Sequence, residues 1–296
     1  MLSNGPLPIE HVARKHQAYP GSQYTLPADD EELQRLTLQH QILKELFGNR
    51  ILLVPVHLDV NDEVLEIGTG PGLWIMDLAK SVNTSIPMFA IDIESRMFPV
   101  LPPKQIEFRV ESATRLPAEW TNTFSLVHQR LLMAGLQRSD WPIVLSEIYR
   151  VLRPGGWVQL GESAAWGGEY PGKPCLEKLT AMVRSIGSSR NLNLDCAKDI
   201  PKMLADAGFL EVQSESRMQR VGKWDGESGV INCINQVAIF KAYKTPVLKA
   251  GGMGYVSSEE EYDLLLEGVE REWDEIPGTE KEFFIFWAKK PLVQLH

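Results

Sequence analysis

The sequence predicts an open, doubly wound α/β sheet, because short apolar runs alternate with helical patterns along most of the chain. Two neighbouring runs end in a carboxylate, at Glu66 and at Asp92. A glycine-rich turn, residues 68–72, follows the first run and leads into a helical pattern. Since ligands bind outside the carboxyl ends of the strands in such sheets, we expect the functional site there.

Seven runs of strand character define the sheet. They cover residues 62–67, 88–92, 106–110, 124–128, 157–162, 209–215 and 283–288. A helix, then a turn at Pro154-Gly155-Gly156, precedes the fifth run, and a helix over 200–207 that stops at Gly208 precedes the sixth. Segments between the runs are long enough for the crossovers that parallel strands need.

Four segments organise the chain. We expect an N-terminal arm and lid helix over 1–55, a ligand-binding core over 56–221, a helical insertion over 222–280 and the last core strand within 281–296. The lid helix begins near Asp29, with Leu33, Leu36, His40, Leu43 and Phe47 on one stripe. The insertion holds two helical patterns, 230–243 and 258–273, separated by Gly251-Gly252-Met253-Gly254. Its functional interpretation is a substrate cap, and the alternatives are a face for homodimer contact or a helix pair without a function in the site.

Composition excludes several classes of protein. The chain has 296 residues, 44% hydrophobic content and a formal net charge of −9, without a Lys/Arg-rich run, which argues against nucleic acid as a partner. No apolar stretch is long enough to span a membrane, and the N-terminus lacks the apolar core of a signal peptide, so we expect a cytoplasmic protein. The three cysteines, Cys175, Cys196 and Cys233, are too scattered to predict a disulfide or a zinc site.

The glycine turn indicates which ligand the site takes. Its sequence, Gly68-Thr69-Gly70-Pro71-Gly72, has neither the dinucleotide spacing G-x-G-x-x-G nor the lysine of a phosphate-binding loop. Glycines still let the backbone turn sharply and approach a ligand closely. Asp92, at the end of the second strand, can accept hydrogen bonds from both hydroxyls of a ribose. A nucleoside that carries no pyrophosphate is therefore predicted.

This turn, with Glu66 before it and Leu152-Arg153-Pro154-Gly155-Gly156 later, resembles the class I S-adenosylmethionine-dependent methyltransferases. The resemblance implies a Rossmann-like sheet whose seventh strand runs antiparallel between the fifth and sixth. It also implies S-adenosylmethionine as cofactor, with Glu66 orienting the loop and Asp92 holding the ribose. The cofactor contacts expected around these two residues are Gly68, Thr69, Gly70, Gly72 and Ile93.

A narrower resemblance extends over residues 23–160. The segment Gln23 to His40, together with His128-Gln129-Arg130 and Asp140-Trp141-Pro142, is similar to the fungal LaeA/UMTA-like methyltransferases. Many of that group act in secondary metabolite biosynthesis, and others regulate it. If the N-terminal arm is a lid, we expect Tyr24 and His40 to close over the methionine end of the cofactor; the alternative for His40 is a histidine packed on its helix. Gln129 is expected to meet the cofactor through its backbone.

The adenine side departs from the class I pattern. These enzymes commonly place an acidic residue after the third strand to accept the adenine amino group, and this chain has Ser112 there. Serine accepts the same bond more weakly, so the neighbouring Glu111 or the backbone of Ala113 are alternatives.

Candidate catalytic and substrate groups follow the fourth and fifth strands. His128 is the candidate base, and the alternative is that it only supports its neighbours. Arg130 would hold the cofactor carboxylate, an acidic substrate or a structural ion pair. Glu162 and Trp166 are the candidate substrate-binding residues. No carboxylate cluster indicates a metal.

The sequence thus predicts a methyltransferase that acts on oxygen or nitrogen of a small aromatic or apolar acceptor. Two alternatives stay open. One is a LaeA-like regulator that binds the cofactor and works through protein partners, which predicts a poorly formed acceptor pocket. The other is a methyltransferase fold that catalyses a reaction without methyl transfer, since a fold does not fix a reaction.

Overall fold

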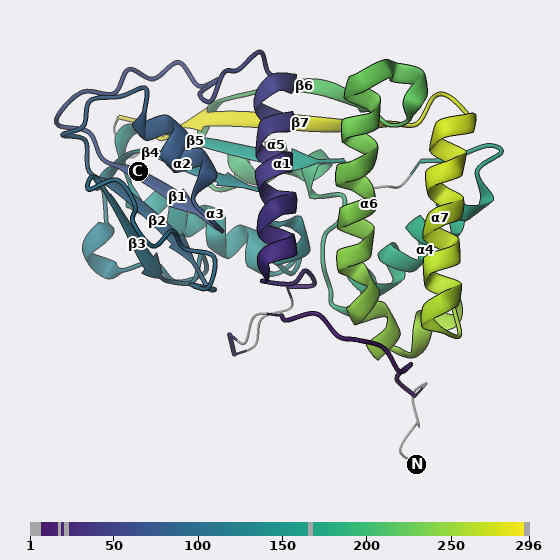
Figure 1. The fold of residues 1–296 in the computed structure, drawn as a ribbon. Helices are drawn as coiled ribbons and strands as arrows, with labels where there is room; N and C mark the ends of the chain where they lie inside the picture. The colour runs from purple at the N-terminus through teal and green to yellow at the C-terminus, as the bar shows by residue number, and fades with distance from the viewer. Residues whose placement is uncertain (1–6, 17–18, 21–23, 165–167, 293–296) are drawn as a thin grey trace.

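The sheet is the frame of the molecule, seen in a computed structural model that describes residues 7–16, 19–20, 24–164 and 168–292 (Figure 1). Within these described ranges, seven strands lie in the order β3-β2-β1-β4-β5-β7-β6. Their bounds are β1 Val64–Ile67, β2 Met88–Asp92, β3 Ile106–Val110, β4 Phe124–Arg130, β5 Leu152–Ser163, β6 Leu210–Arg220 and β7 Glu280–Lys289. Only β7 runs antiparallel to its neighbours, β5 and β6. The predicted α/β sheet with an antiparallel last strand is confirmed.

In the part of the chain that the structure describes, seven α-helices surround or extend this sheet. They are α1 Asp30–Leu46, α2 Leu73–Ala79, α3 Asp140–Val151, α4 Pro174–Ser189, α5 Cys196–Asp206, α6 Gly226–Lys249 and α7 Glu259–Glu275. Short 3₁₀ turns cover 118–120, 132–134, 223–225 and 251–254. In Figure 1, α1 stands between the sheet and the helices α6 and α7.

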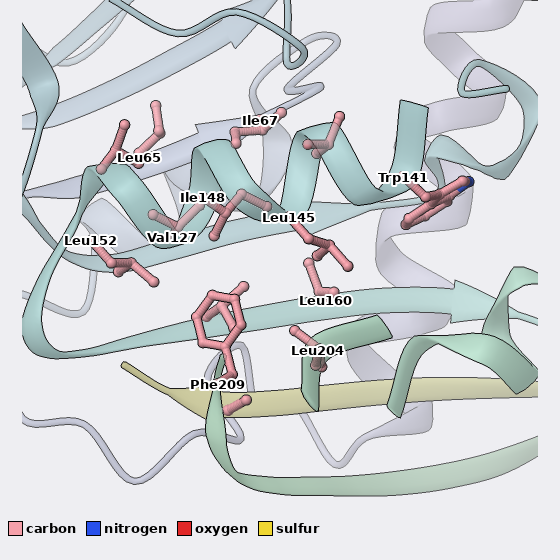
Figure 2. Close-up of a cluster of buried hydrophobic side chains, with 14 of the residues drawn as sticks. Leu65, Ile67, Val127, Trp141, Leu145, Ile148, Leu152, Leu160, Leu204 and Phe209 are labelled. Carbon is pink, nitrogen blue, oxygen red and sulfur yellow. The ribbon is translucent and has the colours of Figure 1, made fainter. Parts of the chain in front are cut away.

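The two faces of the sheet carry separate apolar clusters. On one face, Leu145 and Ile148 of α3 pack over Val127 of β4 and Leu160 of β5, with Leu204 of α5 alongside (Figure 2). On the other face, α2 packs against β1 and β2. Each fully buried leucine or isoleucine contributes about 1.5–3 kcal/mol. These clusters fix the strand ends from which the site is built.

The helical cap, which we define as α4, α6 and α7, has its own core. Tyr262 and Trp273 are fully buried there, and the Tyr262 hydroxyl donates a 2.6 Å hydrogen bond to the carbonyl of Phe240. Helix α4 lies in the sequence before the predicted insertion, so the cap combines two chain segments. The apolar spacing of Leu176, Leu179, Val183 and Ile186 was the signal for α4.

The N-terminal arm is tied to both the cap and α1. Ile9 donates its N–H to the Leu248 carbonyl at 2.9 Å, and Arg14 forms an ion pair with Asp29. Asp29 also caps α1, because its carboxylate accepts the N–H of Glu32 at 3.0 Å. The predicted helix start is therefore confirmed.

The predicted turn at Pro154-Gly155-Gly156 lies inside β5, which begins at Leu152, as an irregularity of the strand: the register with β4 shifts there, and Gly155 has φ 78°. The N–H of Gly155 donates to the Lys290 carbonyl at 3.0 Å, and the N–H of Lys290 donates to the Gly156 carbonyl at 2.9 Å. These bonds join the irregular segment to the chain after β7, a contact that the local sequence did not show. Leu33 is likewise exposed rather than on the packed stripe of α1.

Candidate active site

A large cavity opens at the carboxyl ends of the central strands. From β1 the chain adds β2 and β3 on one side, and it then continues with β4 and β5 on the other side of β1. Ligands bind at such a switch point in open α/β sheets. The cavity holds about 350 Å³ and is lined from the ends of β1, β2, β3 and β4, from α1 and from the arm. Its size falls in the range of small-molecule and cofactor sites.

The glycine turn forms one wall of this cavity. Gly70 has φ 52°, and a Cβ there would meet nothing closer than Leu36 Cδ1 at 3.9 Å, so the backbone faces open space. Gly72 has φ 75°, and a Cβ there would lie 2.5 Å from Phe108 Cζ. The first glycine therefore gives a ligand access to the backbone, and the second allows α2 to begin against β3.

Asp92 faces the turn from the end of β2. One carboxylate oxygen accepts the N–H of Gly70 at 2.8 Å, and the other accepts the N–H of Glu94 at 3.1 Å. Burial raises the pKa of Asp92 to about 6, although these backbone bonds oppose the shift. The carboxylate lines the cavity and keeps acceptor capacity for a ligand's hydroxyl groups.

Glu66 supports the turn from below. Its Oε2 accepts the Thr69 hydroxyl at 2.6 Å and the N–H of Ile75 at 3.3 Å. Its Oε1 lies 3.5 Å from Nδ1 of His128, which is the residue opposite Glu66 on β4. Glu66 does not line the large cavity, so its contacts are with the loop and with His128.

His128 is buried beneath the turn, 3% exposed, with its ring stacked on Trp74. Burial lowers the pKa of the imidazole to about 4 despite the nearby Glu66. It lines only a small cavity of about 30 Å³ under the loop and does not reach the large one. This position favours the supporting role over that of a substrate base.

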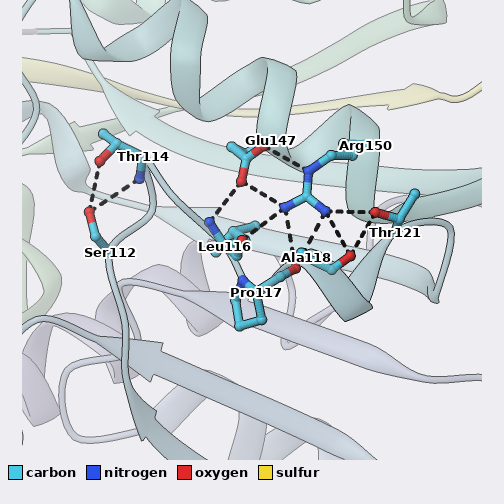
Figure 3. Close-up of polar contacts among 8 residues, drawn as sticks. All are labelled: Ser112, Thr114, Leu116, Pro117, Ala118, Thr121, Glu147 and Arg150. Atoms are coloured by element: carbon cyan, nitrogen blue, oxygen red, sulfur yellow. Dashed lines mark hydrogen bonds and ion pairs between the residues drawn. The ribbon is translucent and has the colours of Figure 1, made fainter.

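The segment after β3 forms the wall expected to face adenine. The Ser112 hydroxyl lies 2.8 Å from that of Thr114 and accepts the Thr114 N–H at 3.3 Å (Figure 3). The loop is anchored by Glu147, which accepts the N–H of Leu116 and pairs with Arg150. Ser112, Ala113 and Glu111 all line the cavity, so the three alternatives for adenine recognition lie together.

Arg130 lines the cavity from the end of β4. Among the described residues no carboxylate lies within ion-pair distance of its guanidinium, and the partner it does have is His40, at 3.0 Å from NH2. Arg130 is partly buried, and a charged guanidinium withdrawn from water without a carboxylate is costly, so this position suits an anionic ligand group.

A second cavity, of about 100 Å³, lies between the core and the helical cap. It shares Tyr24, Leu36, Gln39 and Leu131 with the large cavity. The rest of its wall is mainly apolar, with cationic side chains at three points: Leu26, Arg35, Met133, Ala134, Ser163, Val183, Arg184, Leu194, Ile239, Phe240, Tyr243 and Lys281. Glu32 pairs with Arg35, and Asp195 pairs with Arg184.

Nine of the thirteen predicted cofactor residues line the large cavity: Tyr24, Gly68, Thr69, Gly70, Asp92, Ile93, Ser112, Ala113 and Arg130. The other four, His40, Glu66, Gly72 and Gln129, lie behind its wall. Sequence reasoning missed Leu36 and Gln39, which share a face of α1, and Leu132, Gln137 and Asp140 after β4. The spacing of Leu36, Gln39 and His40 was a signal for the first pair.

The two predicted substrate residues have different outcomes. Trp166 lies outside the described residues. Glu162 is buried under the loop after β4, where it accepts the N–H of Leu132 at 2.7 Å, and burial raises its pKa to about 8. It lines neither of the two larger cavities.

Other site types were also sought. In the described part of the chain, no group of three or more His, Cys, Asp or Glu side chains could hold a metal ion. None of the described helices is long and apolar enough to cross a membrane.

Comparison with known proteins points to one activity. A family model described as a methyltransferase domain matches residues 64–156. The N-methyltransferase sirN of Leptosphaeria maculans is 29% identical over 92% of this chain and 96% of its own length. The N-methyltransferase gliN of Aspergillus fumigatus is 27% identical over 90% and 96%.

Among solved structures, phosphoethanolamine N-methyltransferase 2 of Haemonchus contortus, in complex with phosphomonomethylethanolamine and S-adenosylhomocysteine, aligns with a TM-score of 0.51 and 20% identity. The alignment covers 87% of this chain and about half, 52%, of that enzyme. The [4+2]-cyclase SpnF aligns with a TM-score of 0.50 and 15% identity over 95% and 100%. At these identities the structures show the fold alone.

Proposed function

We propose that this chain, which is an S-adenosylmethionine-dependent methyltransferase with the class I fold, methylates a nitrogen atom of a small molecule. Four of its relatives are named N-methyltransferases, which supports nitrogen over oxygen. We further propose that the acceptor is an aromatic or apolar metabolite of a biosynthetic pathway. The LaeA/UMTA-like subfamily remains our proposal for the chain's place among these enzymes.

The cofactor fits the large cavity by the chemistry of its wall. Asp92 offers acceptor oxygens for ribose hydroxyls, and Arg130 offers a guanidinium without a carboxylate partner among the described residues for the methionine carboxylate. Ser112 and Glu111 lie where adenine would be recognised. When bound, the cofactor supplies an electrophilic methyl group on a sulfonium. The residues around it then orient the two reactants and exclude water.

The observation that carries the proposal is the junction of the two cavities. They share Tyr24, Leu36, Gln39 and Leu131 in their walls, so a molecule in the second cavity would lie next to one in the first. The mainly apolar wall of the second cavity suits an apolar or aromatic acceptor, held by the arm, α1 and the cap. In this proposal the predicted substrate cap, residues 222–280, acts together with α4.

The proposal assigns His128 to support of Glu66 and the glycine loop, in place of the predicted role as a base. The regulatory alternative called for a poorly formed acceptor pocket, and the second cavity argues against it. The likeness to a cyclase concerns the fold and does not favour a reaction without methyl transfer.

The test uses methyl-labelled S-adenosylmethionine with paired acceptors that differ only in the nucleophile, such as anilines against phenols and indoles against naphthols. We expect label in the nitrogen member of a pair, confirmed by mass spectrometry. The Asp92→Ala variant, which should lose the cofactor, is the matched control. Label only in oxygen acceptors, or cofactor binding without transfer to any acceptor, would contradict the proposal.

A further inference from the structure

A line of three polar side chains connects the large cavity to the outer surface of α2. Arg130 NH2 lies 3.0 Å from Nδ1 of His40, and Nε2 of His40 lies 3.1 Å from Oδ2 of Asp77. The three residues come from β4, α1 and α2. Of the three, only Arg130 lines the large cavity.

The hydrogen-bonding chemistry of these groups fixes the state of His40. A guanidinium has only donors, so Nδ1 of His40 must offer its lone pair to Arg130. The ring proton then sits on Nε2 and is donated to the Asp77 carboxylate. His40 is therefore neutral and held in one tautomer, between a cation and an anion.

The charges around His40 agree with this state. Burial lowers the pKa of His40, and Arg130 lowers it further, while Asp77 opposes both. Burial would raise the pKa of Asp77, but bonds from Lys44, Lys80 and His40 outweigh it and hold the carboxylate ionised. The charge of Glu66 raises the pKa of His40, and the charge of His40 lowers the pKa of His128.

We propose that His40 and Asp77 are positioning residues, which aim the Arg130 guanidinium at the carboxylate of the bound cofactor. This inference rests on the proposed assignment of Arg130 to that carboxylate. Neither His40 nor Asp77 lines the large cavity, so both act through Arg130. Asp77 fixes the tautomer of His40, and His40 fixes the direction of an arginine that otherwise has no ion pair among the described side chains.

The same contacts couple helix α1 to cofactor binding. Helix α1 reaches α2 through two side chains, because Lys44 also bonds Asp77, at 2.8 Å. A cofactor that holds Arg130 in place therefore also favours α1 docked against α2. The contribution of His40 should depend on whether the ligand has a carboxylate.

The experiment is a calorimetric titration with two ligands. S-adenosylhomocysteine carries the amino acid group, whereas 5′-methylthioadenosine shares the adenosine and thioether without it. For His40→Ala, we expect the Kd of S-adenosylhomocysteine to rise about 3-fold to 10-fold, the range for one hydrogen bond, with that of 5′-methylthioadenosine unchanged within a factor of about two. Equal losses for both ligands, or no loss for either, would overturn the inference.

Matched variants keep the test independent of folding. Asp77→Ala should reproduce the selective loss, whereas Lys80→Ala, which removes an exposed partner of the same carboxylate, should leave both affinities unchanged. If His40→Ala folds poorly, His40→Gln is the second variant, because its amide can accept from Arg130 and donate to Asp77. It should recover part of the affinity. Thermal melting of each variant reports folding directly.

A double-mutant cycle separates the positioning role of His40 from the assignment of Arg130 to the cofactor carboxylate. In the Arg130→Met background, His40→Ala should cause no further loss of S-adenosylhomocysteine affinity. If Arg130→Met itself leaves that affinity unchanged, the assignment of Arg130 to the carboxylate is wrong. If Arg130→Met weakens binding but His40→Ala does not, only the positioning role is wrong.

Discussion

His128 stacks on Trp74 with ring centroids 3.6 Å apart and ring planes within 6° of parallel. Glu66 Oε1 lies 3.5 Å from Nδ1 of the same imidazole. A histidine packed in this way must stay neutral in the folded protein, because protonation would place an imidazolium in a buried apolar stack. The relationship therefore predicts how the stability of the fold depends on pH.

The unfolded chain should take up a proton at His128 near pH 6.5, whereas the folded protein, with a pKa of about 4, should not. Between these values the unfolded state binds more protons, so the free energy of unfolding falls as pH falls, by at most about 3 kcal/mol at this residue. His128→Phe keeps a stacked ring and removes the titration. Urea unfolding at pH 4.5 to 8 should show a shallower pH dependence for the variant, and parallel curves would contradict the prediction.

Asp92 should give cofactor binding its own pH dependence. Its pKa of about 6 means that the carboxylate is half protonated at that pH, and a protonated carboxyl accepts ribose hydroxyls less well. We expect the affinity for S-adenosylhomocysteine to fall up to about tenfold per pH unit below 6. Titration calorimetry between pH 5 and 8 measures this slope.

Two controls isolate Asp92 from other groups. Asp92→Asn should bind weakly, with a loss of about 1.5–3 kcal/mol, and without the slope. The wild-type protein should show the same slope with 5′-methylthioadenosine, which retains the ribose but lacks the ionisable amino acid. A slope seen only with the complete cofactor would assign the titration to the Arg130 side of the cavity.

The sequence was sufficient for the sheet and for the centre of the site because both depend on local patterns. Apolar runs that alternate with helical patterns predict the strands, and the resemblance to the class I enzymes implies their order. Glu66 and the glycines follow directly on the first strand, and Asp92 ends the second, so strand ends predicted locally place them at one edge of the sheet. Gly70, Asp92 and Ser112 all line the large cavity for this reason.

The features that the sequence did not predict depend on packing between segments that are far apart in the chain. Glu32 and Arg35 look like the exposed start of a helix, yet both are buried, because α1 is enclosed between the sheet and the cap and the two side chains pair at 2.6 Å. His128 follows a strand end, where a base would be useful. Its pairing with Glu66 across the β1–β4 register, which no local pattern reports, places it below the loop instead.

We expect the buried ammonium group of Lys281 to lower the free energy of unfolding of the wild-type protein. The side chain lines the second cavity, and burial lowers its pKa to about 8, so at neutral pH the charged form is held at a cost. Lys281→Met keeps the aliphatic stem and should raise the free energy of unfolding by about 2 kcal/mol at pH 7. The gain should shrink as pH rises from 8 towards 10.5, because the unfolded lysine also loses its charge there.

A cation kept at such a cost indicates a function in the acceptor cavity. In the Lys281→Met variant, the KM for a methylated acceptor should rise, while the Kd of S-adenosylhomocysteine should stay within a factor of about two. Chemical denaturation at pH 7 and pH 10 tests the stability part without any acceptor. If Lys281→Met is less stable than the wild type at both pH values, the lysine contributes to packing, and its charge does not destabilise the fold.

Gly70 and Gly72 should respond differently to alanine, although they are two residues apart in the same turn. At Gly72 the added Cβ would lie 2.5 Å from Phe108 Cζ, and the residue has φ 75°, so Gly72→Ala should lose about 2–4 kcal/mol of stability through overpacking and backbone strain. At Gly70 the new methyl group meets no atom closer than 3.9 Å, and the φ of 52° alone costs about 1–2 kcal/mol.

The Gly70 methyl group instead enters the large cavity, where it would occupy space that the cofactor needs. Gly70→Ala should therefore remain folded in thermal melts and lose most of its affinity for S-adenosylhomocysteine. Gly72→Ala should melt earlier and, at a temperature where it is folded, keep more of that affinity. The opposite ranking would mean that the turn contacts the ligand through Gly72, and that the open backbone at Gly70 serves only the fold.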